Sequence, residues 1–151
     1  MPHFTASEKS AEVIASGEKI ELDRTLTVLL VGVGGQGTIL AGSLLAMAAA
    51  DAGLDVKVSE IHGMSQRGGS VSTVVRMGEK VESMVADPGC ADVIVAFESV
   101  EALRAQDYLR EGGKMFVNDE VIVPVSVAIG NFEMPEDIEG KLDELGAVRI
   151  P

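Results

Sequence analysis

The sequence feature that most constrains the fold is an apolar run followed by a glycine-rich loop and a long helix signal. Residues 26–33, LTVLLVGV, are nearly all apolar and rich in β-branched side chains. Such a run predicts a strand buried on both faces of a parallel sheet. Residues 36–53 are rich in Ala and Leu and lack proline, so they predict a helix ended by Gly53. Residues 54–61, LDVKVSEI, alternate between apolar and polar side chains and contain β-branched residues, which predicts a second strand. Strand, helix and strand together form a βαβ unit.

The rest of the chain continues to alternate between strand and helix signals. Residues 78–85 predict a turn and a strand that form a β-hairpin with residues 70–77. Residues 98–113 predict a helix that stops at two glycines. Further strands are expected at 92–97 and 114–118, an extended segment at 121–129, and a short acidic helix and a last strand over 134–150. We therefore expect a single α/β domain with a Rossmann-like, doubly wound, mainly parallel sheet and a β-hairpin addition.

The domain organisation follows from length and composition. The chain has 151 residues, which is enough for one hydrophobic core. Residues 1–25 are polar and predict a loosely attached N-terminal arm, and residues 26–151 form the domain. Only four Phe and one Tyr supply aromatic area, so the core must consist of aliphatic side chains and Met.

Composition also excludes several functional classes. Asp and Glu number 24 against 12 Lys and Arg, so no general field attracts nucleic acid or anionic lipid. One cysteine, Cys90, cannot hold an iron–sulfur cluster, which needs about four thiolates. We also expect no metal site and no disulfide. No apolar run approaches the roughly 18 residues that cross a membrane, and no signal peptide is visible, so we expect a cytoplasmic protein.

The glycine loop GVGGQG, residues 32–37, is the first candidate site. Gly32, Gly34 and Gly37 match GxGxxG, where a helix N-terminus and close backbone approach suit a phosphate. Glu60 stands near the end of the second strand, where a dinucleotide-binding protein keeps its ribose-binding acid. The same small residues also let a helix pack closely on a sheet with no ligand, so both interpretations stay open.

A second loop, HGMSQRGG at residues 62–69, follows the second strand and so emerges at the same carboxyl edge. Arg67 can bind a carboxylate or phosphate through two parallel hydrogen bonds, and the glycines after it allow a partner to approach closely. His62 can move a proton, but no recognisable catalytic set accompanies it, so a loop histidine without a catalytic role is the simpler interpretation. The same holds for Cys90, which has no visible base and is expected to be an inert thiol.

Three segments in this order and spacing carry a resemblance to a known family. They are VGVGGQGTILAGSLLA, VKVSEIHGMSQRGGSVSTVVRMG, and ADVIVAFESVEALR with the following GGKMFVN. Together they resemble the beta subunit of indolepyruvate:ferredoxin oxidoreductase, which is similar to the gamma subunit or domain of pyruvate and other 2-oxoacid:ferredoxin oxidoreductases. The resemblance covers about residues 26–125, and HGMSQRGGSV is its most specific part.

The resemblance implies an accessory subunit rather than a complete catalyst. In that family, thiamine diphosphate, Mg and the iron–sulfur clusters belong to a large alpha subunit, and the complex uses coenzyme A and ferredoxin to oxidise an arylpyruvate. We therefore expect no catalytic residue and no cofactor of its own in this chain. The candidate residues for an anion-, coenzyme A- or subunit-facing surface are Gly32, Gly34, Gly35, Gln36, Gly37, His62, Met64, Gln66, Arg67, Gly68 and Gly69. An Arg67→Ala variant is expected to weaken assembly or to raise the KM for coenzyme A.

Two alternatives and one departure accompany this hypothesis. The chain could instead be a free-standing nucleotide-binding module that uses Gly32, Gly34, Gly37 and Glu60, or a purely structural interaction protein, and the isolated chain could form a homodimer. Members of the family usually continue with further C-terminal helices beyond the point at which GAVRIP stands here. This difference predicts a C-terminally truncated domain that lacks part of the layer covering the sheet.

Overall fold

The computed structural model describes residues 20–62 and 68–151 of the chain. Within these residues the elements are β1 (Leu26–Val33), α2 (Thr38–Asp51), β2 (Asp55–His62), β3 (Ser70–Gly78), β4 (Ala91–Ala96), α3 (Ser99–Ala105), the 3₁₀ turn η1 (Gln106–Tyr108), β5 (Leu109–Asn118), α4 (Val125–Ala128), α5 (Ile138–Glu144) and β6 (Val148–Ile150). None of the helices in these two ranges has the length and apolar character needed to cross a membrane.

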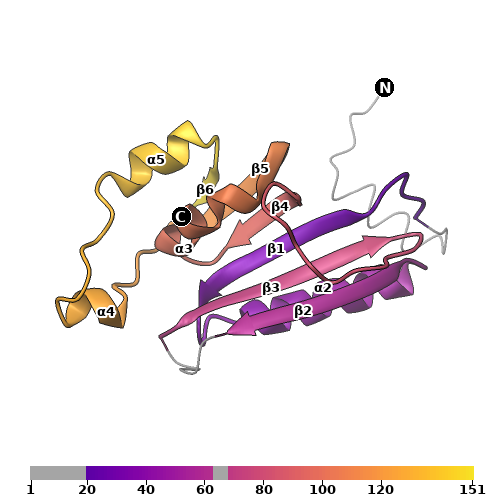
Figure 1. Ribbon diagram of the computed structural model, residues 1–151, viewed down its shortest axis with the longest axis horizontal. Helices are drawn as coiled ribbons and strands as arrows, with labels where there is room; N and C mark the ends of the chain where they lie inside the picture. Colours follow the sequence, from indigo (N-terminus) through magenta and orange to yellow (C-terminus); the bar gives the residue numbers. More distant parts are fainter. Residues whose placement is uncertain (1–19, 63–67) are drawn as a thin grey trace.

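The described strands form one six-stranded sheet in the order β2-β3-β1-β4-β5-β6 (Figure 1). The pairs β1–β4, β4–β5 and β5–β6 are parallel, whereas β3 is antiparallel to both of its neighbours. The middle and end of β1 are buried, as expected for a central strand covered on both faces. The mainly parallel α/β sheet predicted from the sequence is thus confirmed.

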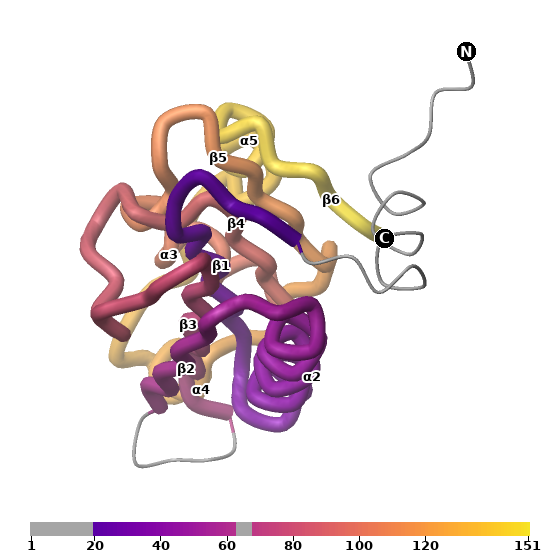
Figure 2. Tube along the Cα trace, turned by 90° about the vertical axis from the view of Figure 1, so that its right-hand side faces the viewer, coloured from indigo at the N-terminus to yellow at the C-terminus, as the bar shows by residue number. Residues whose placement is uncertain are grey.

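Helices cover both faces of the sheet and give three layers (Figure 2). On one face, α2 packs on β1, β2 and β3 around Leu30, Val75 and Met77. On the other face, α3 packs on β1, β4 and β5, and α5 contacts α3. Leu142 of α5 is fully buried in the core of that second face. Because apolar side chains alternate to opposite sides of each central strand, one sheet supports two cores, and the doubly wound arrangement is confirmed.

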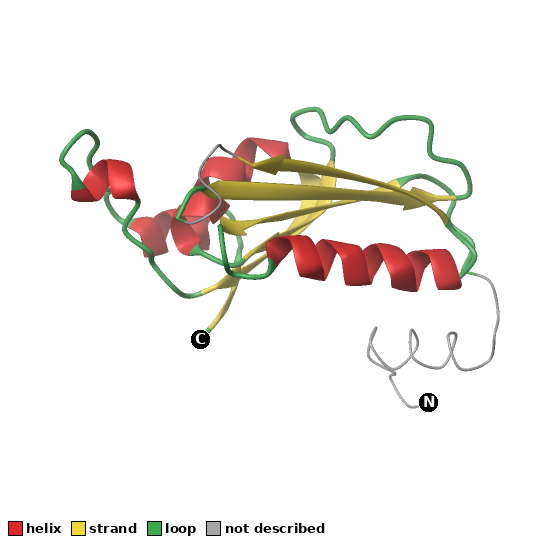
Figure 3. Ribbon diagram, turned by 90° about the horizontal axis from the view of Figure 1, so that it is seen from below, coloured by secondary structure: helices red, strands yellow, loops and turns green. Residues whose placement is uncertain are grey.

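The predicted hairpin between residues 70–77 and 78–85 is wrong. β3 pairs instead with β2, from Asp55 opposite Gly78 to His62 opposite Val71, and also separates β2 from β1. Residues 79–90, which we call the strap, contain no strand and cross the α3 side of the sheet (Figure 3). Arg76 holds the strap there because its Nη1 donates to the carbonyl oxygens of Ser83 and Val85, at 2.8 and 3.2 Å.

The predicted helix over residues 98–113 ends early, and Gly112 and Gly113 lie inside β5. Ala91 pairs with Leu109 but Val93 with Lys114, so the glycines belong to a bulge in which β5 has extra residues. Gly112 has φ +77°, and a Cβ on Gly113 would lie 3.0 Å from the carbonyl oxygen of Ala91. Glycine pairs serve bulges as readily as helix ends, which explains the misassignment.

The extended conformation predicted for residues 121–129 is wrong over its second half, where α4 forms. Pro124 is the N-cap of α4, and its carbonyl oxygen accepts from the N–H groups of Val127 and Ala128, at 2.9 Å each. Proline suits the start of a helix because its φ is fixed and it has no N–H to leave unpaired. β-Branched residues concealed this turn in the sequence, since they favour strands.

Candidate binding site at the carboxyl edge of the sheet

The glycine loop connects β1 to α2 and leaves the start of that helix open. Gly35 and Gly37 have φ values of +99° and +87°, a region that glycine enters at little cost. A Cβ on either residue would meet no atom within 4 Å, so open space surrounds them. α2 has no side-chain cap and no acidic residue in its first turn. The N–H groups of that turn, together with the positive end of the helix dipole, therefore face a space that suits an anion.

Gly32 allows the protein to pack closely around the end of β1, and it does not open space for a ligand. A Cβ there would lie 2.9 Å from both Gln36 Oε1 and Thr38 Oγ1 and 3.1 Å from Phe97 Cβ. The sequence did not single out a comparable glycine, Gly42 of α2, where a Cβ would lie 2.5 Å from Thr73 Cγ2. These two glycines bring the loop and the helix close to the sheet.

Gln36, a candidate surface residue in the sequence, turns its side chain toward the protein. Its Oε1 accepts from the N–H of Val33 at 2.8 Å, and its Nε2 donates to the carbonyl oxygen of Phe97 at 3.0 Å. Nε2 also lies 3.4 Å from Glu120 Oε2. Asn118 donates to the same two acceptors, at 3.1 and 3.2 Å. Gln36 thus fixes the glycine loop to the ends of β1 and β4. No pattern in the sequence pointed to Asn118 or Glu120.

The two candidate loops are in direct contact. The N–H of Gly34 donates to the carbonyl oxygen of Gly69 at 2.8 Å. Gly68 has φ +76°, and a Cβ on it would lie 3.7 Å from Cγ2 of Val125 in α4. The glycine loop, the end of the second loop and α4 therefore meet at one edge of the sheet. Met64, Gln66 and Arg67 lie outside the described residues.

A cavity of about 580 Å³ lies beside the glycine loop on the α2 side of the sheet. Its lining combines the glycine loop, the first turns of α2, and the paired residues His62 and Val71. Thr38 is 3% exposed, and its Oγ1 has no hydrogen-bond partner among the described residues. A buried hydroxyl without a partner is costly, so a ligand group that bonds to it would be favoured. The cavity can therefore hold an anionic group against backbone N–H groups, with His62 at its rim.

The geometry does not favour the dinucleotide alternative. In a dinucleotide-binding fold, the acidic residue follows the strand next to β1. Here β3 lies between β1 and β2, which places Glu60 two strand spacings, roughly 10 Å, from β1. Glu60 is opposite Thr73 in the ladder and does not line the cavity.

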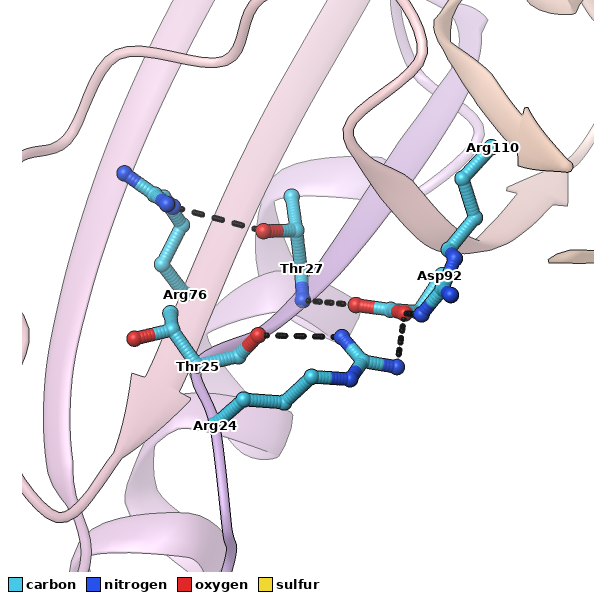
Figure 4. A network of polar contacts seen from close by, with 6 residues as sticks. All are labelled: Arg24, Thr25, Thr27, Arg76, Asp92 and Arg110. Atoms are coloured by element: carbon cyan, nitrogen blue, oxygen red, sulfur yellow. Dashed lines mark hydrogen bonds and ion pairs between the residues drawn. The ribbon is translucent and has the colours of Figure 1, made fainter.

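A cluster of charged side chains lies at the opposite, amino edge of the sheet (Figure 4). Asp92 Oδ1 accepts from Arg24 at 2.6 Å and from Arg110 at 2.7 Å, and its Oδ2 accepts from the N–H of Thr27 at 2.9 Å. Burial opposes ionisation of Asp92, but these hydrogen bonds outweigh it and lower its pKa to about 2. The cluster joins the start of the domain to β1, β4 and β5, which is a structural role.

Cys90 has the environment of an unreactive thiol. It is half-buried just before β4, at the amino edge and away from the cavity. Burial raises the pKa of its thiol, which disfavours the nucleophilic thiolate.

Comparison with known proteins gives consistent matches. The family model described as "Pyruvate ferredoxin/flavodoxin oxidoreductase" matches residues 27–150. "Indolepyruvate oxidoreductase subunit IorB" of Thermococcus kodakarensis is 52% identical over 133 residues, which cover 82% of this chain and 66% of that protein. The protein of the same name from Pyrococcus horikoshii is 47% identical over 119 residues, covering 78% and 59%. The chain thus spans less than two thirds of the length of either relative.

Two solved structures have a similar fold. The pyruvate oxidoreductase subunit PORC of Thermotoga maritima aligns with a TM-score of 0.52 and 25% identity, covering 64% of this chain and 51% of that one. A 2-oxoglutarate:ferredoxin oxidoreductase from Magnetococcus marinus, solved with 2-oxoglutarate, coenzyme A and succinyl-CoA bound, aligns with a TM-score of 0.59 and 22% identity, covering 86% of this chain and 20% of that one.

Proposed function

This chain belongs to the pyruvate ferredoxin/flavodoxin oxidoreductase family, and on that premise we propose that it is the accessory (beta) subunit of an indolepyruvate or arylpyruvate:ferredoxin oxidoreductase. The complete enzyme would convert a 2-oxoacid and coenzyme A to an acyl-CoA and carbon dioxide, and would pass the two electrons to ferredoxin. The clusters would reside in the large alpha subunit, because this chain has a single cysteine. The resemblance implies that thiamine diphosphate and Mg are bound by that subunit as well.

The observation that carries the proposal is the junction of the two loops through Gly34 and Gly69. It creates one continuous surface at the carboxyl edge that contains the uncapped start of α2 and the 580 Å³ cavity. In this proposal the surface faces the active site of the large subunit, and the helix start holds a phosphate group of coenzyme A. The buried Thr38 hydroxyl would donate to the same group.

Exposed apolar residues beside this surface support docking on another chain. We call them the apolar collar: Val121, Val123, Val125, Ile129 and Phe132, which are 49–68% exposed. The collar includes α4, which projects beyond the sheet on the side of the glycine loop (Figure 1). The segment that carries the collar is anchored to the domain, because the N–H of Ile122 donates to the buried carboxylate of Glu98 at 3.0 Å. Grouped exposed apolar side chains of this kind are typical of interaction sites.

Co-expression with a candidate large subunit tests the proposal. We expect the two chains to purify together and to reduce ferredoxin when supplied with an arylpyruvate and coenzyme A. Replacing both Ile129 and Phe132 with Ser is expected to abolish co-purification, since it removes apolar area from the centre of the contact. The matched control is Val148→Ser, which changes a side chain that is 50% exposed on β6, and should leave assembly intact. Activity that is the same with and without this chain would contradict the proposal.

A further inference from the structure

A second cavity, of about 440 Å³, lies on the face of the sheet opposite the glycine-loop cavity. Its floor is formed by β1, β2 and β3, its roof by residues 84–86 of the strap, and its end wall by α3 and Tyr108. Figure 3 shows the strap above the sheet on the α3 side. Because α3 packs mainly on β1, β4 and β5, the strap covers the part of this face over β2 and β3.

The roof is held in place by hydrogen bonds of its own. Besides the two bonds from Arg76, the N–H of Val85 donates to Ser83 Oγ at 3.1 Å. The strap is also fixed near its start, where the N–H of Val81 donates to Asp55 Oδ2 at 2.7 Å. The pocket is therefore formed before any ligand arrives, which is the usual condition of a small-molecule site.

The walls differ in polarity from one end to the other. Leu29, Val31 and Val74 of the floor and Val85 and Ala86 of the roof make the body of the pocket mostly apolar, and Ser59 and Ser72 are the polar residues of the floor there. At the α3 end stands Glu101, which is only 4% exposed. Its Oε2 accepts from Ser70 Oγ at 2.6 Å and its Oε1 from Arg104 Nη1 at 2.8 Å.

These contacts leave Glu101 able to accept another hydrogen bond. A carboxylate offers about four acceptor positions, and the two bonds described occupy two of them. Arg104 balances its charge, so the pocket has no need of a ligand cation. An anionic ligand group at this end is disfavoured, because it would lie beside the carboxylate oxygens of Glu101.

We propose that this pocket binds a neutral aromatic molecule that carries one hydrogen-bond donor on its edge. The ring lies between the strap and the sheet, and the donor bonds to Glu101. The volume of the cavity falls within the range typical of small-ligand sites, roughly 300–1,000 Å³. The proposal concerns the opposite face of the sheet from the coenzyme A surface and does not depend on it.

A matched pair of probes tests the requirement for a donor. 2-Naphthol has the apolar rings and an O–H donor, and 2-methoxynaphthalene has the same rings without the donor. Isothermal titration of the full chain is expected to give one site for 2-naphthol with a Kd of about 100 µM. The methoxy compound should bind about tenfold more weakly, which is the loss of one hydrogen bond to a charged group. Equal binding of the two probes, or no binding of 2-naphthol, would overturn the proposal.

Fluorescence and a pair of variants locate the site. Tyr108 lines the pocket and is the only tyrosine in a chain without tryptophan, so quenching of its emission by 2-naphthol reports on this pocket. Ser72 lies on the floor, and Ser72→Phe should fill the cavity and abolish binding, whereas Ser72→Ala should bind as the wild type does. Ala86→Leu narrows the pocket from the roof and should also weaken binding, in case Ser72→Phe does not fold. Unchanged binding in the folded filled variants would place the probe elsewhere and reject the proposal.

Discussion

At the residue scale, Gln36 shows how the same side chain can suit two interpretations. In the sequence it stands among glycines at a helix start, so it is a natural candidate for a surface contact. In the structure its amide satisfies the N–H of Val33 and the carbonyl oxygen of Phe97, two backbone groups at the ends of adjacent strands. Its effect on a ligand is therefore indirect, because it holds the loop whose N–H groups face the cavity.

Gln36→Met is expected to lower the free energy of unfolding by about 1–3 kcal/mol, because it keeps the side-chain volume but leaves partly buried backbone groups without partners. Gln106→Met is the matched control, since Gln106 is exposed after α3 and the same change there should be nearly neutral. Urea unfolding of both variants and the wild type measures the difference. Equal stability of the two variants would show that the Gln36 hydrogen bonds contribute nothing.

At the element scale, the sequence predicts a strand or helix correctly where its pattern allows one interpretation, and fails where two segments compete for the same partner. β1 and α2 could be predicted because an apolar strand and an Ala-rich helix ended by Gly53 have few other solutions; Gly53 has φ +87°, as a residue ending a helix often does. The partner of β3 could not be predicted, because residues 54–61 and 78–85 are both plausible neighbours in sequence. In the structure, Arg76 and Asp55 bind residues of the strap through hydrogen bonds that no periodicity in the sequence reveals.

The packing of α2 on β3 gives a prediction at this scale. Gly42→Ala gains helix propensity of about 1 kcal/mol, but its methyl group would lie 2.5 Å from Thr73 Cγ2. We expect the clash to outweigh the gain and to destabilise the fold by about 1–2 kcal/mol.

Two further variants isolate the cause of this effect. Thr73→Ser removes the clashing methyl group, so the double variant with Gly42→Ala should be more stable than the sum of the single effects. Ser43→Ala on the exposed side of α2 should be neutral or slightly stabilising, since it raises helix propensity and brings no methyl group against the sheet. If chemical unfolding shows strictly additive effects for Gly42→Ala and Thr73→Ser, the close approach is not what makes glycine necessary at this position.

At the scale of the whole molecule, the two edges of the sheet carry different sets of exposed and polar groups. The carboxyl edge carries the open start of α2, a Thr38 hydroxyl with no hydrogen-bond partner among the described residues, and exposed apolar side chains, whereas the amino edge carries a closed network centred on Asp92. The sequence placed both candidate loops at one edge because parallel topology requires it. It could not reveal Asp92, whose partners Arg24 and Arg110 come from segments 68 and 18 residues away.

The Asp92 network predicts how stability depends on pH. Its pKa falls to about 2 on folding, below the value of about 3.9 in an unfolded chain. A lowered pKa contributes stability that is fully present above about pH 4 and is lost as the pH falls toward about 2. Asp92→Asn should therefore cost about 2 kcal/mol near neutral pH, and the difference from the wild type should disappear near pH 2.

Urea unfolding at a series of pH values from about 7 to about 2 measures this difference. Asp92 is a strong contributor because its side chain is only 10% exposed while two guanidinium groups and a backbone N–H bind it. Glu82 provides the control: it pairs with Lys80 at 3.0 Å, but both side chains are 78% exposed, so solvent screens the pair. Glu82→Gln should follow the wild type at every pH. If the difference in the free energy of unfolding between the wild type and Asp92→Asn stayed constant down to pH 2, the charge of Asp92 would not be its cause. Protonation at low pH removes that charge and leaves the shape of the side chain unchanged, so a constant difference would have to come from shape.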